Sequence, residues 1–305
     1  MVGAEIVSSW DSTTRALRAV APLTGPFPRA PFLQVWESQF AKPTAETSIV
    51  HSAGGALPIW IDEGTIRFQG EADVTDYHAA LGSSIEPSVA LLGERFSGFD
   101  FSFDSVPIEG RTQLLSALDQ TATTVAVRTH AATLILDLPA EPGAWLASLS
   151  KKHRHEVRRK QRRFVDLVGE PVYERRSDST AFTAFVAMHR AAPGAKATFM
   201  TARAEAFFLA LLAEVGACID VLSVDGRPVA AAFGFADREG YYLYNSAYEP
   251  ALAEAAPGVV LLAAMIERSI SDGLARFDFL KGDERYKYHL GAVERPLSVI
   301  EGTFA

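Results

Sequence analysis

Hydrophobic and polar residues alternate along the first half of the chain with the periods of short strands and short helices. Residues 99–106 place Phe99, Phe101 and Phe103 on one side, which is the period-two pattern of a half-buried strand. Residues 56–61 and 65–69 have strand patterns separated by Asp-Glu-Gly, a hairpin turn. The same patterns predict helices over 32–40, 77–81, 87–92 and 113–118, and strands over 123–128 and 133–138.

Beyond the proline-flanked junction at 139–142, the predicted elements are longer and more regular. Residues 145–168 are expected to form a single amphipathic helix that ends at Gly169. Its apolar stripe comprises Leu146, Leu149, His153, Val157, Phe164 and Val168. Further strands are predicted over 172–175, 219–224, 228–236, 240–248, 276–280 and 297–302, and helices over 180–191, 201–215 and 259–271, with a short helix before the last strand. We therefore expect an α/β protein with mixed sheets and two lobes, residues 1–138 and 139–305.

Composition supports two cores and argues against several classes of function. The chain has 305 residues, of which 48% are hydrophobic and 22% are charged. A net charge of −8 argues against DNA binding, and the single cysteine, Cys218, excludes an intramolecular disulfide. Residues 1–20 lack the pattern of a signal peptide, and no window approaches the roughly 20 apolar residues of a membrane span. We expect no membrane insertion and a cytoplasmic location.

Common catalytic motifs do not occur in the sequence. It contains no phosphate-binding P-loop, no dinucleotide-binding glycine motif, no H-E-x-x-H and no G-x-S-x-G. His153 and His155 are two residues apart, a spacing that does not suit two metal ligands on one helix face. No metal site is expected.

A first positive signal is the helix start at Pro257-Gly258. A helix that begins there presents free backbone N–H groups and the positive end of its dipole, which suits a pyrophosphate or another anion. The simpler interpretation is that proline at the first helical position only favours helix initiation. On this feature alone, the simpler interpretation is preferred.

A second signal is the segment 277–291, where an aromatic strand leads into a turn dense in titratable side chains. Acyl transfer to an amine needs a base and a hydrogen-bond donor for the developing negative charge. The candidate bases are Asp278, Asp283, Glu284 and His289, and the candidate donors are Tyr286, Lys287 and Tyr288. The alternative is a charged surface turn whose acidic and basic groups pair locally.

Three segments of the second half resemble the GNAT-like acetyltransferase domain of proteins associated with bacterial cellulose and polysaccharide biosynthesis, a group related to the Fem peptidyltransferases. They contain SKKHRHEVRRKQRRF, DVLSVDGRPVAAAFGF, and a longer region with YNSAYEP, APGVVLLAAMIERSISDG and FDFLKGDERYKYHLG. The last is the most specific, since the family has a D-F-x-x-G-x-x-x-Y-K pattern there. GEADVTDYHAAL is similar to an element of the family's first lobe.

The resemblance implies two tandem GNAT-like lobes, the first of them reduced or degenerate, with the acyl donor held by the second. It implies that the donor's pantetheine runs beside strand 243–248 and that its phosphates meet the next helix. The implied donor-binding residues are Asn245, Tyr248, Pro257, Gly258 and Val259. The resemblance implies roles for Lys287, Tyr286 and Tyr288, and with the candidate bases Asp283 and Asp278 they form the expected catalytic group.

The expected reaction is transfer of an acyl group from acyl-CoA, such as acetyl-CoA, to an amine or hydroxyl of a small molecule or glycan precursor. The loop AEAAPGVV departs from the usual acetyltransferase phosphate signature, Q/R-x-x-G-x-G/A. Two alternatives therefore stay open: Fem-like transfer from aminoacyl-tRNA, and a non-catalytic binding module that keeps the fold. The basic helix 145–168 could contact RNA phosphates or pair with acidic surface.

Overall fold

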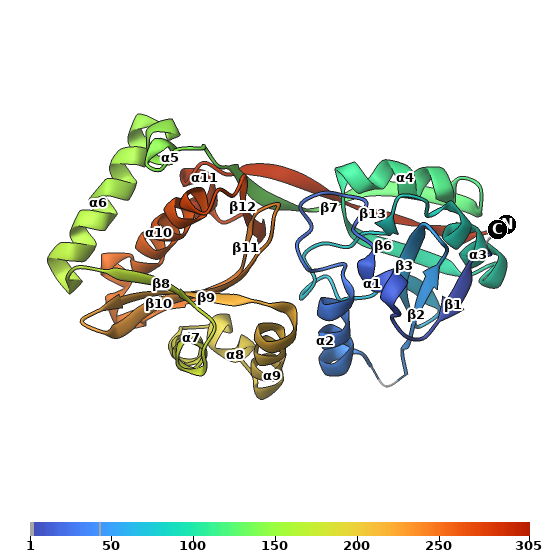
Figure 1. The fold of residues 1–305 in the computed structure, drawn as a ribbon, viewed down its shortest axis with the longest axis horizontal. Helices are drawn as coiled ribbons and strands as arrows, with labels where there is room; N and C mark the ends of the chain where they lie inside the picture. Colours follow the sequence, from blue (N-terminus) through green and yellow to red (C-terminus); the bar gives the residue numbers. More distant parts are fainter. Residues whose placement is uncertain (1–2, 43) are drawn as a thin grey trace. The chain divides into compact units, whose positions relative to one another are not determined.

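The chain folds into two compact units (Figure 1), as a computed structural model of residues 3–42 and 44–305 shows. The first comprises Met1–Thr133 with Arg295–Ala305, and the second comprises Leu134–Glu294. The last strand, β13 (Val293–Phe304), pairs antiparallel with β6 (Asp100–Pro107). This pairing places Arg295–Ala305 in the first unit, whereas the sequence-based division left all of 139–305 in one lobe.

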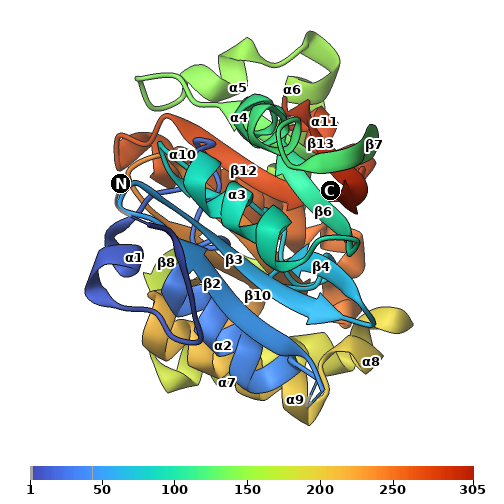
Figure 2. The same cartoon turned by 90° about the vertical axis from the view of Figure 1, so that its right-hand side faces the viewer.

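The first unit is a mixed sheet with helices packed on it. Its strand order is β1-β2-β3-β4-β6-β13, and β5 pairs with β3. Figure 2 shows α3 crossing β2 and β3, and these elements are in contact. The strands not yet given are β1 (Glu5–Val7), β2 (Glu46–His51), β3 (Gly55–Asp62), β4 (Thr65–Phe68) and β5 (Leu81–Gly82), and the helices are α1 (Ser12–Ala16), α2 (Ala30–Phe40), α3 (Glu86–Arg95) and α4 (Ile108–Leu118). The predicted hairpin is confirmed, because β3 and β4 pair antiparallel across the Asp-Glu-Gly turn.

Two predictions in the first unit are wrong. Residues 77–81 do not form a helix, because the backbone bonds to neighbouring segments instead: His78 N donates to Ser105 O at 3.1 Å, and Val20 N donates to Ala80 O at 3.0 Å. The two strands predicted over 123–128 and 133–138 are one strand, β7 (Ala122–Asp137). The intervening residues include no proline or glycine that would end a strand.

The second unit contains the sheet order β12-β11-β10-β9-β8, in which β11 and β12 are parallel and the other neighbours are antiparallel. The strands predicted for this region are confirmed as β8 (Val172–Arg176), β9 (Cys218–Val224), β10 (Arg227–Ala236), β11 (Tyr241–Tyr248) and β12 (Arg276–Lys281). α10 (Pro257–Ser271) packs on one face, with α6 (Lys151–Val168) against α10, and α7 (Ser179–Ala191) packs on β10 and β11 from the other (Figure 1). The two-lobed α/β architecture is therefore confirmed.

The long helix predicted over 145–168 is interrupted. α5 (Ala144–Ser148) ends at Leu149, whose extended backbone (ψ 151°) separates it from α6. Ser150 then caps α6, since its hydroxyl accepts from His153 N at 3.2 Å. Trp145 on α5 is buried and donates to Leu290 O at 2.9 Å, so the break allows α5 to anchor separately.

Other departures in the second unit are local. The predicted helix 201–215 is α9 (Ala202–Ala210) followed by a π-helical turn, Leu211–Val215, which ends at a left-handed Gly216. The expected loop before α10 contains a 3₁₀ helix, Pro250–Ala255. Two short helices complete the unit, α8 (Ala195–Phe199) and α11 (Arg285–His289). None of the described helices is long and apolar enough to cross a membrane.

A buried polar network centred on Asp220 connects β8, β9 and β11. The Asp220 carboxylate is fully buried and accepts hydrogen bonds from Arg175 Nε at 2.9 Å, Tyr241 Oη at 2.5 Å and the Tyr173 hydroxyl. The Arg175 guanidinium lies 4.7 Å from the centre of the Tyr241 ring and also donates to Asp272 at 3.1 Å. This network fixes the register of three strands inside the second unit's core.

Candidate functional site

The candidate site begins where β11 and β12 stop pairing. Their parallel register joins Tyr241 to Phe277 and Tyr242 to Asp278, while β11 continues to Tyr248 and β12 to Lys281. The backbone of β11 beyond Tyr242 therefore has a strand edge that is not paired with β12 in the described residues. Such an edge can bind an extended ligand that carries amide groups.

A β-bulge modifies β11 at the same place. Leu243 pairs with Gly234 and Asn245 pairs with Phe233, so Tyr244 is an extra residue in the ladder. As a result both Tyr244 and Asn245 contact the α7 side of the sheet. The Tyr244 ring lies 5.5 Å from that of Phe208 on α9.

Asn245 is held by a histidine that the sequence analysis did not select. His189 on α7 is 1% exposed, and its Nε2 lies 2.8 Å from Asn245 Oδ1. Asn245 Oδ1 also accepts from Ser246 N at 2.8 Å. The oxygen is an acceptor, so His189 carries its proton on Nε2, and the Asn245 amide nitrogen keeps two donors that bond no described residue. The only sequence signal was a histidine within an apolar helix face, which is more often structural.

The start of α10 lies next to the end of β11, as the resemblance implied. Ala256 precedes the helix in a left-handed conformation (φ 55°), and no side chain caps the helix. A Cβ added to Gly258 would lie 3.6 Å from Tyr248 Cδ1, so the Tyr248 ring borders the first turn. Tyr248 is 39% exposed. The structure thus brings Tyr248, Pro257, Gly258 and Val259 together at the positive end of a 15-residue helix.

The turn after β12 is held together by Lys287. Its ammonium is 3% exposed and donates to Lys281 O at 2.8 Å and Gly282 O at 3.2 Å, with Glu284 Oε2 at 2.9 Å. Leu280, near the end of β12 and just before this turn, has a left-handed backbone (φ 58°), which is unfavourable for a branched residue. The fully buried Asp278 accepts from Leu280 N at 2.7 Å. Lys287 therefore bonds the backbone of the turn, and Asp278 bonds the end of β12 that leads into it.

Of the two predicted tyrosine donors, Tyr286 keeps its hydroxyl unengaged. Tyr288 Oη donates to Glu294 Oε1 at 2.5 Å, and this bond, with burial, raises the pKa of Tyr288 to about 12. Burial, reinforced by the Glu284 charge, raises the pKa of Tyr286 well above its usual value. Its hydroxyl makes no hydrogen bond within the described residues, so Tyr286 is a protonated phenol that can donate to a ligand. Asp283 is exposed on the turn.

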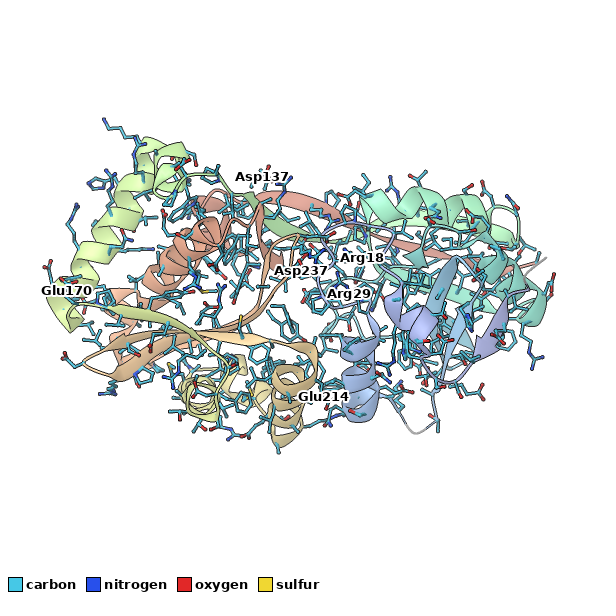
Figure 3. The ribbon with its side chains drawn as sticks, in the orientation of Figure 1. Arg18, Arg29, Asp137, Glu170, Glu214 and Asp237 are labelled. Carbon is cyan, nitrogen blue, oxygen red and sulfur yellow. The ribbon has the colours of Figure 1, made fainter. Side chains whose placement is uncertain are left out.

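One further feature, a depression, lies outside this arrangement. A depression of about 410 Å³ at the end of α6 is lined by Gln161, Arg162, Val165, Asp166 and Glu170. Figure 3 shows Glu170 at that end and Asp237 in the turn between β10 and β11, well away from it. Across residues 3–42 and 44–305, no three His, Cys, Asp or Glu side chains are grouped so that they could hold a metal ion.

Comparisons with known proteins place this geometry in context. Residues 151–288 match the model of the acetyltransferase (GNAT) domain. A conserved protein of unknown function from Bacteroides thetaiotaomicron has the same fold, with 14% identity, a TM-score of 0.66 and coverage of 95% of each chain. The structure titled FemX is also similar, with 12% identity, a TM-score of 0.63 and coverage of 97% of this chain and 96% of that one. No curated protein sequence matches the chain. Over residues 151–288 the second unit, with its parallel β11 and β12 and the start of α10 beside them, is thus similar to the GNAT acetyltransferase domain.

Proposed function

We propose that the second unit transfers an acyl group from acyl-CoA, such as acetyl-CoA, to an amine or hydroxyl of a small molecule or glycan precursor. The observation that carries this proposal is the separation of β11 from β12 directly beside the start of α10. An extended pantetheine arm, with its two amides, would bond the edge of β11. Its pyrophosphate would meet the N–H group of Gly258, next to Val259, whose own N–H donates to Ala256 O at 3.0 Å.

The residues around this gap have proposed roles in the transfer. The Asn245 amide, oriented by His189, would donate to a carbonyl oxygen of the donor. The acceptor's nitrogen or oxygen attacks the thioester carbon, the C–S bond breaks, and the thiolate leaves. Tyr286 would stabilise that thiolate as a hydrogen-bond donor. Its raised pKa keeps the phenol protonated, so its O–H remains available to donate. Asp278 and Asp283 are the proposed bases for the acceptor's proton.

Lys287 and Tyr288 are proposed to position the catalytic segment. Both are already engaged by protein groups, Lys287 by the turn carbonyls and Tyr288 by Glu294. A side chain whose polar atoms all bond other protein groups holds its neighbours in place, and it does not need to contact the donor.

Replacing Gly258 with aspartate tests the donor site. An acid in the first turn of α10 favours the helix dipole by about 0.3–1 kcal/mol, so stability should hold or rise. The same carboxylate would repel the donor's phosphates, and we expect acetyl-CoA affinity to fall at least about tenfold by calorimetric titration. Gly258→Ala is the matched control, because its methyl group would meet Tyr248 at an ordinary contact distance. If the Gly258→Asp and Gly258→Ala variants bound acetyl-CoA with equal affinity, the donor's phosphates would not lie at the start of α10.

Aminoacyl transfer from charged tRNA is a second candidate, and the basic α6 favours it. Eight cations lie in this helix: Lys151, Lys152, Arg154, Arg158, Arg159, Lys160, Arg162 and Arg163. Filter binding of bulk aminoacyl-tRNA with strong salt dependence, together with no response to acetyl-CoA, would favour it. If the protein bound neither donor, the non-catalytic binding module would become the preferred interpretation.

A further inference from the structure

Five basic side chains gather where α6 meets α11. They are Lys152, His153 and Lys160 on α6, and Arg285 and His289 on α11. The imidazole rings of His153 and His289 lie 4.5 Å apart, centre to centre, and are inclined by 34°. His153 and Lys160 are seven residues apart, so they project from the same face of α6. We call these five residues the α6–α11 basic cluster.

Among the described residues, Lys160 is the one member of this cluster that forms an ion pair, with Glu156. Lys152 and Arg285 are exposed and form no ion pair with any residue that the structure describes. Burial, followed by the positive charges of His153, Arg285, Lys160 and Lys152, lowers the pKa of His289. Cations therefore face this imidazole from both helices.

The acid on this face of α6, Glu156, is already engaged. Arg159 donates to both of its carboxylate oxygens, at 2.9 and 2.8 Å, and Lys160 lies at 3.7 Å. The hydrogen bond from Arg159 is the main reason that the pKa of Glu156 is lowered to about 2. One carboxylate shared by two cations leaves the rest of the cluster with excess positive charge.

Helix stability does not account for these cations. The first turn of α6 contains no acid and four basic residues, Lys151, Lys152, His153 and Arg154. Cations at this end oppose the helix dipole and destabilise the helix. The chain as a whole carries a net charge of −8, so this concentration of positive charge is local. A bound anion would relieve both the mutual repulsion and the opposition to the dipole.

We propose that the α6–α11 basic cluster binds a phosphate group. Arg285 matches a phosphate through paired N–H donors, Lys152 and Lys160 supply point charges, and each imidazole adds an N–H. The phosphate belongs either to a phosphorylated small molecule or to an RNA backbone. The site does not depend on which acyl donor the second unit uses, so its test is separate from that of the proposed function.

Imidazole NMR of the full chain, followed as a function of pH with and without inorganic phosphate at constant ionic strength, tests the site. A bound anion favours the protonated rings, so two of the seven histidines should show raised pKa values. These signals should vanish in His153→Gln and His289→Gln, one in each variant. Phosphate that shifts no histidine, or shifts others than these two, would overturn the proposal.

A charge-matched pair of variants separates a built site from the general charge of α6. Arg285→Gln should weaken phosphate binding at least about tenfold, the loss expected for a charge-assisted hydrogen bond. Arg162→Gln removes the same charge from α6, nine residues beyond His153 and thus about 13 Å along the helix. It should change the affinity less than about twofold, because that distance exceeds the screening length. Equal losses in the two variants would contradict a localised site.

Two ligands distinguish whether the phosphate belongs to a small molecule or to RNA. Glucose 1-phosphate and a short single-stranded RNA are titrated into the wild type and Arg285→Gln. Tighter binding of glucose 1-phosphate, lost in the variant, supports the site with a small-molecule ligand. Tighter binding of the RNA, with a steep salt dependence that Arg285→Gln reduces, supports it with a phosphodiester. If Arg285→Gln affects neither probe, the cluster is not a phosphate site.

Discussion

Replacing Asp220 with alanine is expected to lower the free energy of unfolding by about 3–5 kcal/mol, the usual cost of removing one partner from a buried ion pair. The variant would leave the Arg175 guanidinium inside the second unit without its carboxylate at 2.9 Å. The hydroxyls of Tyr173 and Tyr241 would lose their acceptor at the same time. A loss of this size is comparable to the whole stability of many domains.

Urea denaturation followed by circular dichroism measures this loss. Asp220→Asn keeps the side-chain volume and one acceptor but removes the charge, so its loss should be smaller than that of Asp220→Ala. The control is Asp166→Ala, an exposed carboxylate in α6, which should change stability by less than about 0.5 kcal/mol. If Asp220→Ala were as mild as this control, the network would not hold the strands together.

Replacing Lys287 with methionine is expected to reduce turnover about a hundredfold and to lower stability by about 1–3 kcal/mol. Methionine has a similar length but no donor, so the carbonyls of Lys281 and Gly282 would lose a buried partner. The strained left-handed backbone at Leu280 would then lose the Lys287 hydrogen bonds that help to stabilise it. Because Asp278 bonds Leu280 N directly before this turn, a displacement of the order of 1 Å there can cost about a hundredfold in rate.

The combination of the two losses distinguishes positioning from direct catalysis. A lysine that orders the turn should affect thermal stability and turnover together in Lys287→Met. A lysine that contacts the reacting atoms would reduce turnover and leave the melting temperature unchanged, which would contradict our assignment. Lys151→Met, an exposed lysine of the same unit, should leave both quantities unchanged.

The sequence predicted most of the strands because hydrophobic alternation and turn residues lie within a few positions of one another. The Phe-rich alternation in β6 and the Asp-Glu-Gly hairpin are examples that the structure confirms. The break between α5 and α6 was missed because helical spacing continues across it. It depends on the burial of Trp145 and its bond to Leu290, which is distant in sequence. Residues 77–81 were misassigned for the same reason, since their backbone partners lie in other segments.

The candidate site shows the same division between local and distant signals. The density of titratable residues in 277–291 selected the turn, but could not show that the Lys287 ammonium is buried inside it. His189 and Asn245 are 56 residues apart, so no spacing pattern connects them. Their pairing depends on α7 packing against a bulge in β11, which is a property of tertiary structure.

Hydrogen exchange of the wild-type protein with saturating acetyl-CoA is the most direct test of the central claim, that the donor lies along β11 and at the start of α10. We expect added protection in peptides that cover residues 243–248 and 257–260, where the donor would bond backbone N–H groups. Gly258→Asp should lose this protection, while Gly258→Ala keeps it. Unchanged exchange at both segments, or protection confined to the first unit, would contradict the account.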